Sequence, residues 1–283
     1  MTIPVNLHYT EQGSGTPLVL LHGFPFSSAI WREQLARLSD QYRVITPDLR
    51  GHGRSPATDD VYSMELLAAD VIALLDTLNI EQAVIMGHSM GGYVTLALAR
   101  RAPERLIALG LIGSQAAADT DEARKKRFEL IEAVTKQGSQ AVSEAMMPRL
   151  FAPIEQEDET IKEQVNALML SIKPAVLINT IRGLAARHDS TALLSGFELP
   201  VLIIAGDKDA IIPLENSEML ATLPTHCTLA TIENGGHMMM LEQPQATTLA
   251  IRQFMDEIQA QLDALADAMN NPETPPESDP AVE

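Results

Sequence analysis

Residues 87–92 read Gly-His-Ser-Met-Gly-Gly and directly follow the apolar run Ala83-Val84-Ile85-Met86. A short aliphatic run that ends at glycine is typical of a buried strand. Residues 89–102 are typical of a helix that Pro103 stops. Three glycines in six residues weaken regular structure, so they need a reason. This stretch is either an ordinary strand-to-helix turn or a turn that presents Ser89 as a nucleophile.

The pattern Gly87-x-Ser89-x-Gly91 matches the nucleophile elbow, although the same five residues also occur by chance in surface turns. In an elbow the serine has a strained backbone, and neighbouring segments approach it closely. Glycines two residues before and two residues after the serine remove side chains that would clash. The helix that starts here aims its N–H groups at an anion forming beside the serine. The strand before and the helix after favour the functional interpretation.

Further short apolar runs repeat this pattern along the chain, at residues 18–21, 43–48, 106–112 and 201–204. Continuous apolar runs indicate strands covered on both faces. Helical patterns separate them, as in residues 64–78, where apolar side chains recur every three or four positions. The alternation predicts an α/β fold with a mostly parallel central sheet flanked by helices. Residues 5–9 alternate apolar and polar, which predicts an antiparallel edge strand.

The alternation stops between Ser114 and Ser195, where helical periodicity is present and no convincing strand is found. Pro148, Pro153 and Pro174 divide this stretch into several helices. We therefore predict a core of residues 1–113 and 196–269, interrupted by a helical cap of residues 114–195. Residues 270–283 are rich in Pro and Glu and predict a disordered acidic tail.

Composition excludes several classes of function. The 283 residues carry a formal net charge of −18, which disfavours nucleic-acid binding. No apolar stretch reaches the roughly 18 residues of a membrane span, and the first residues lack a signal-peptide pattern. A single cysteine, Cys227, excludes an internal disulfide framework and indicates a reducing compartment. We expect a cytoplasmic protein; its oligomeric state stays open.

A serine hydroxyl needs a base, and seven histidines are available. His88 adjoins Ser89, but on a sharp turn its side chain should point elsewhere. His237 lies in the polar loop Glu233-Asn234-Gly235-Gly236-His237, between a predicted strand that ends at Ile232 and the C-terminal helix. Open α/β sheets place their chemistry in such loops. His237 is therefore the predicted base.

A carboxylate must fix the tautomer of the base and stabilise its charged form. Two aspartates compete in the loop Gly206-Asp207-Lys208-Asp209. Asp207 could be a turn residue, the commonest role of Asp after Gly. Asp209 lies deeper in the loop, before Pro213. Acyl transfer also needs two N–H donors for an oxyanion. We expect these donors to be the backbone N–H groups of Met90 and of Phe24, since the next residue, Pro25, has none.

Together these motifs resemble the α/β-hydrolase superfamily, and within it the capped carboxylesterases, enol-lactone hydrolases and cofactor-free perhydrolases. The resemblance covers residues 5–268 and rests on residues 22–25, 48–55, 87–92, 206–213 and 236–237, in family order. The order Ser89, Asp209, His237 is the family's triad order. One departure is that the segment before residue 18 leaves room for fewer strands than the family's eight.

The resemblance implies a serine esterase that acts on a small carboxylic ester and uses no cofactor and no metal. Ser89 would attack the ester, His237 would transfer the proton, and Asp209 would orient His237. Two alternatives stay open. The same triad could open lactones, hydrolyse carbon–carbon bonds or form peracids, because fold and triad do not separate these reactions. The chain could also be a non-catalytic small-ligand receptor on the same fold.

Overall fold

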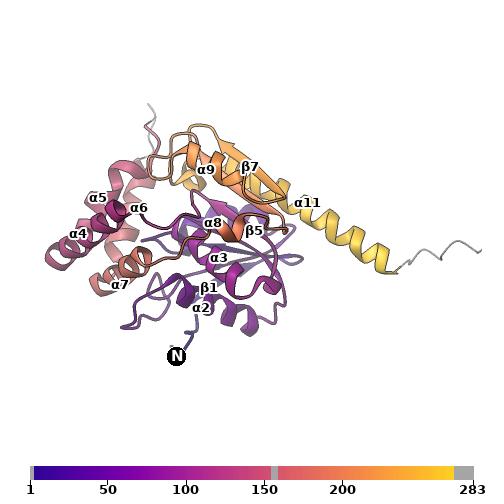
Figure 1. Ribbon diagram of the computed structural model, residues 1–283, viewed down its shortest axis with the longest axis horizontal. Helices are drawn as coiled ribbons and strands as arrows, with labels where there is room; N and C mark the ends of the chain where they lie inside the picture. The colour runs from indigo at the N-terminus through magenta and orange to yellow at the C-terminus, as the bar shows by residue number, and fades with distance from the viewer. Residues whose placement is uncertain (1–2, 154–158, 271–283) are drawn as a thin grey trace, which may run out of the picture.

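A computed structural model describes residues 3–153 and 159–270 of the chain (Figure 1). Its centre is a seven-stranded sheet in the order β1-β3-β2-β4-β5-β6-β7. All neighbouring pairs are parallel except β1 and β3. The strands are β1 (Tyr9–Gln12), β2 (Pro17–Leu21), β3 (Arg43–Pro47), β4 (Ala83–His88), β5 (Leu106–Ile112), β6 (Val201–Gly206) and β7 (Cys227–Ile232).

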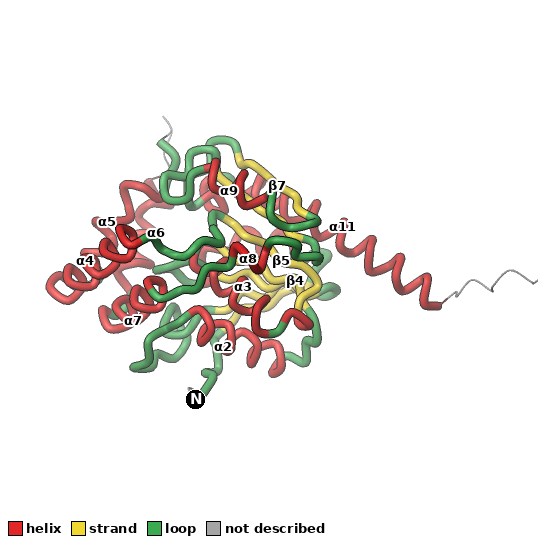
Figure 2. Tube along the Cα trace, viewed as in Figure 1, coloured by secondary structure: helices red, strands yellow, loops and turns green. Residues whose placement is uncertain are grey.

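Helices cover both faces of this sheet, as Figure 2 shows. One face packs against α2 (Met64–Thr77), α3 (Met90–Arg101) and α9 (Leu214–Ala221). The other packs against the short 3-10 helix η1 (Ser28–Trp31), α1 (Arg32–Leu38) and α11 (Pro244–Asn270). Alternate residues of one strand enter the two cores: Val19 lies in the first, and Leu18 and Leu20 lie in the second. Burial on both faces explains why the strands are continuously apolar, and the predicted fold class is confirmed.

The antiparallel edge strand lies later in the chain than the sequence pattern predicts. It spans Tyr9–Gln12, whereas residues 5–8 form no strand. The backbone of residues 5–8 pairs with side chains and with a loop instead. Val5 N–H donates to Asp70, His8 N–H donates to Ser55 Oγ, and His8 C=O accepts from Asp48 N–H. These bonds to the loop after β3 replace the ladder that the alternating pattern favoured.

Residues between β5 and β6 form the predicted helical insertion, and its described part contains no strand. Four of its helices lie together to one side of the sheet in Figure 1. Pro148 does not divide two helices, as expected, but lies inside α5 two residues before its end. The insertion comprises α4 (Asp121–Gln137), α5 (Gln140–Leu150), α6 (Glu159–Ser171), α7 (Pro174–Ala185) and α8 (Thr191–Leu194).

The last helix, α11, continues past the body of the protein (Figure 1). Its first half is buried through Ile251, Phe254 and Met255, whereas Leu265 and Met269 are exposed. The predicted tail lies outside the described residues apart from Asn270, where α11 ends. Among the described helices, none alone is long and apolar enough to span a membrane. α6 and α7 pass that test only as a pair, bent by 94°.

Candidate active site

The topology gathers the three predicted triad residues at one edge of the sheet. Ser89 follows β4, Asp209 follows β6 and His237 follows β7. The parallel strands β4, β5, β6 and β7 are consecutive neighbours, so their carboxyl ends lie side by side. Such an edge is where open α/β sheets bind ligands.

Ser89 has the strained backbone that an elbow requires, with φ 49° and ψ −112°. It is partly exposed, whereas the residues on either side of it are buried. The flanking glycines are needed for close approach. A Cβ on Gly87 would overlap the backbone of Gly91, and a Cβ on Gly91 would lie 2.5 Å from the carbonyl oxygen of Leu21. Neither site has room for a side chain, so the glycines keep strand and helix in contact around Ser89.

His237 and Asp209 form a buried pair. The Nδ1 atom of His237 lies 2.8 Å from Oδ2 of Asp209, and both side chains are about 1% exposed. Oδ1 of Asp209 accepts hydrogen bonds from the N–H groups of Ile211 and Ile212, at 2.7 and 2.9 Å. A carboxylate is an acceptor only, so Nδ1 of His237 carries the proton and Nε2 has the free lone pair.

The Nε2 atom of His237 is buried and has no hydrogen-bond partner among the described residues. The hydroxyl of Ser89 is therefore not bonded to it in this structure. Catalytic hydrogen bonds are often long without substrate and shorten when substrate binds. An unpaired basic nitrogen beside the elbow is chemically able to accept a proton from a nucleophile.

Asp207, the competing acid, lies in a different position. Its Oδ1 accepts from Gly235 N–H at 3.3 Å, and its Oδ2 lies 3.3 Å from Lys208 Nζ. It links the two loops without contacting the imidazole. The structure thus brings Asp209, and not Asp207, to His237.

Phe24 and Met90 flank the elbow. Phe24 is in the loop after β2, where a Cβ added to Gly23 would lie 3.1 Å from Cβ of Ser89. Met90 is the first residue of α3. Within the described part of the chain, neither backbone N–H donates a hydrogen bond. Two unsatisfied N–H groups near a serine at a helix N-terminus are suited to bind a developing oxyanion.

His88 points away from the role of base, as expected. It is fully buried, and its Nε2 donates to the backbone carbonyl of His237 at 2.9 Å. Burial, helped by the nearby His237, lowers the pKa of His88 well below the usual range, so its ring is neutral. His22 is also buried, with Nδ1–H donating to the Gly23 carbonyl and Nε2 accepting from Leu49 N–H. His22 therefore holds the loop that carries Phe24.

The loop of residues 51–55 has a structural environment. Asp48 before it accepts from the N–H groups of Ser28 and Arg54, at 2.8 and 2.9 Å. Arg50 makes a buried bidentate pair with Asp70, at 2.6 and 2.8 Å. The three methionines after His237, Met238–Met240, are fully buried in the core beside α11. Within the described residues, no group of three or more His, Cys, Asp or Glu side chains could hold a metal ion.

Sequence reasoning missed one ionisable residue near the base. Glu242 ends the short helix α10 (Met239–Glu242), and its carboxylate binds the backbone on both sides of a contact with the insertion. A signal for it was present, since Glu242 ends the apolar run Met238-Met239-Met240-Leu241 five residues after His237. An acidic residue at the end of a buried run needs a partner.

Comparison with known proteins identifies the family. Residues 16–244 match the model of the α/β-hydrolase fold family. The chain is 31% identical to 3-oxoadipate enol-lactonase 2 of Acinetobacter baylyi, over 89% of this chain and 93% of that protein. It is 30% identical to a putative carbamate hydrolase of Pseudomonas syringae, over 88% and 96%. Among solved structures it is similar to a thermophilic esterase from Thermogutta terrifontis, with 36% identity, a TM-score of 0.86 and coverage of 89% and 93%.

Proposed function

This chain belongs to the α/β-hydrolase family, and we propose that it is a serine hydrolase that cleaves small carboxylic esters through an acyl-enzyme intermediate. The observation that carries the proposal is the buried His237–Asp209 pair, at 2.8 Å, on the same sheet edge as the strained Ser89. The similarity to an esterase and to an enol-lactonase supports the same class of chemistry.

In the proposed mechanism, Oγ of Ser89 attacks the ester carbonyl while Nε2 of His237 accepts the hydroxyl proton. Asp209 stabilises the imidazolium through Nδ1–H. The backbone N–H groups of Phe24 and Met90 donate to the tetrahedral oxyanion. His237 then protonates the leaving alcohol, and water, activated by the same imidazole, hydrolyses the acyl group from Ser89.

The helical insertion of residues 114–195 would act as a cap on this site. Support comes from contacts between the insertion and the loops that carry the acid and the base. Arg149 Nη2 donates to the carbonyl of Ala210, and Met238 N–H donates to the carbonyl of Leu150. An insertion held at these loops lies where it can bound an acyl or alcohol pocket.

Lactone opening is the second candidate, because a lactone is an internal ester and the same steps open it. The 31% identity to an enol-lactonase favours it among the alternatives on this triad. A small-ligand receptor without catalysis is the remaining alternative.

A substrate panel tests the proposal. Purified protein and Ser89→Ala are assayed with p-nitrophenyl esters of graded chain length and with an enol-lactone. We expect turnover of at least one short-chain ester by the wild type and none above background by Ser89→Ala. Turnover confined to the lactone would replace the ester proposal with a lactonase. No turnover of any substrate, with wild type and variant alike, would support the receptor.

A further inference from the structure

The carboxylate of Glu242 joins two segments that are distant in sequence. Its Oε1 accepts from Ala152 N–H at 2.6 Å, and its Oε2 accepts from Gly236 N–H at 3.0 Å. Ala152 belongs to the insertion, and Gly236 directly precedes His237. Two N–H donors on one carboxyl group favour its ionised form, because each carboxylate oxygen is then an acceptor.

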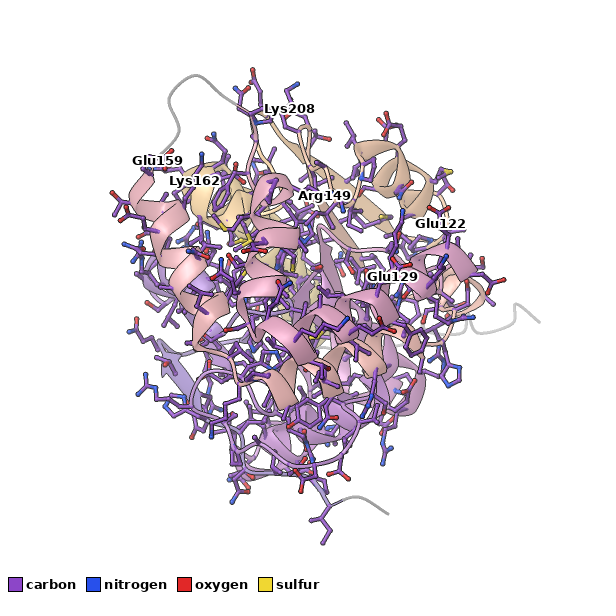
Figure 3. The ribbon with its side chains drawn as sticks, turned by 90° about the vertical axis from the view of Figure 1, so that its left-hand side faces the viewer. Glu122, Glu129, Arg149, Glu159, Lys162 and Lys208 are labelled. Carbon is purple, nitrogen blue, oxygen red and sulfur yellow. The ribbon has the colours of Figure 1, made fainter. Side chains whose placement is uncertain are left out.

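The insertion packs tightly on the loop of the base. A Cβ added to Gly236 would overlap the backbone at Phe151 and Ala152. Met238 N–H donates to the carbonyl of Leu150 at 3.1 Å. Nearby, Arg149 Nη2 donates at 2.6 Å to the carbonyl of Ala210, the neighbour of Asp209. Figure 3 shows Arg149 on the face of the insertion, below the loop that carries Lys208.

Three consecutive residues around the base are thus each held by a group from elsewhere. Gly236 N–H is bound by Glu242, His237 C=O is bound by His88, and Met238 N–H is bound by Leu150 C=O. Of these three partners, Glu242 alone also binds the insertion, through Ala152. Its loss would release the insertion and the base loop together.

We propose that Glu242 is a positioning residue that, as a carboxylate, ties residues 150–152 of the insertion to the His237 loop and keeps the imidazole aligned with Asp209 and Ser89. The inference rests on the proposed function, because alignment matters only if His237 is the base. Glu242 touches no reacting atom, so its effect passes through the backbone of Gly236.

The tie depends on charge. Burial raises the pKa of Glu242 to about 7, and the negative charge of Asp209 adds to this, whereas the two backbone N–H groups and His237 act against it. A protonated carboxyl would present an O–H to one of the two N–H donors, and one bond would be lost. The base loop is therefore held more firmly above about pH 7 than below it.

The experiment compares Glu242→Gln with Glu218→Gln, a matched change at an exposed glutamate of α9. A glutamine at 242 keeps the shape but offers an NH₂ group to one of the two N–H donors. The first readout is the rate at which a fluorophosphonate probe labels Ser89 between pH 5.5 and 9. We expect Glu242→Gln to be labelled about 10-fold more slowly than wild type at pH 8, the effect of about one hydrogen bond. Glu218→Gln should match wild type.

The shape of the pH profile separates positioning from a general loss of structure. In wild type the labelling rate should decrease in a step with a midpoint near pH 7 in addition to the titration of the imidazole. That step should be absent in Glu242→Gln. Equal rates for wild type and Glu242→Gln at pH 8, or the same profile in both, would overturn the proposal.

A second readout needs no activity. The amide ¹H resonances of Ala152 and Gly236 in wild type should titrate together with a midpoint near pH 7. Ala152 is the more diagnostic of the two, because it is not adjacent to His237 in the chain. Amides that do not respond near this pH would contradict the proposal even if Glu242→Gln failed to fold. If the probe labelled no serine, the proposed function would fail, and the amide titration would still show whether the tie exists.

Discussion

Ser89 and His237 meet at one sheet edge but are positioned in different ways. Ser89 is fixed by local sterics: the turn between β4 and α3 allows no side chain at Gly87 or Gly91, and Ser89 N–H donates to the carbonyl of Ile112 on the adjacent strand. His237 is fixed by hydrogen bonds from distant parts of the chain, including His88, Asp209 and Glu242. The nucleophile should therefore respond sharply to small steric changes, and the base should respond in graded steps and with pH.

The largest effect is expected for Ser89→Ala. Loss of the nucleophile in a serine triad lowers kcat by roughly 10⁶-fold. Steady-state ester hydrolysis measures it, with circular dichroism to show that the fold is kept. Retention of more than a few per cent of wild-type kcat would mean that another residue attacks the substrate.

Asp209→Asn should come next, with a loss of about 10⁴-fold in kcat. An asparagine that still accepts from Ile211 and Ile212 turns its NH₂ group toward Nδ1 of His237 and favours the wrong tautomer. Asp207→Asn is the matched control, since Asp207 contacts Gly235 and not the imidazole. A larger loss in the control than in Asp209→Asn would exchange the roles of the two aspartates.

Gly91→Ala tests the steric side of the comparison. Its new Cβ would lie 2.5 Å from the carbonyl oxygen of Leu21, so the elbow must shift and kcat should fall about 100-fold. Gly196→Ala is the control: φ there is 78°, and a Cβ would meet nothing within 4 Å. It should cost about 1 kcal/mol of stability and no activity. Wild-type kcat in Gly91→Ala would show that the elbow tolerates a side chain.

The smallest effect concerns stability and Glu242. Since burial raises its folded pKa from 4.5 to about 7, its contribution to stability is fully present below about pH 4.5 and is lost as pH rises through 7. The free energy of unfolding of wild type minus that of Glu242→Gln should fall by about 2 kcal/mol between pH 5 and pH 8. Urea unfolding measures it. An increase over that range would show that the carboxylate is stabilised rather than penalised by its surroundings.

The sequence predicted the steric region well, because its determinants are contiguous. A strand, a G-x-S-x-G turn and a helix occupy residues 83–101, and the structure has these elements within one residue of the predicted bounds. The sheet and the helical insertion were also predictable from apolar periodicity. Residues 5–8 were predicted as a strand but form none, because Asp70 and Ser55 bind their backbone, and a local pattern contains no such information.

The hydrogen-bonded region was less predictable. His237 and Asp209 could be chosen from chain order and loop context, but the contact of Glu242 with Ala152 spans 90 residues. His88 could be excluded as the base from the sharpness of the turn. Its bond to the carbonyl of His237 required the folded packing of β4 against the base loop.

The central claim, that Ser89 is the nucleophile activated by His237, is tested most directly by mapping the adduct of a fluorophosphonate probe. Wild type, Ser89→Ala and His237→Ala are treated at pH 8, digested and analysed by mass spectrometry. The account predicts one adduct, on Ser89, in wild type, none in Ser89→Ala and labelling slowed by at least about 1,000-fold in His237→Ala. An adduct on another residue, or wild-type labelling of Ser89 without His237, would contradict it.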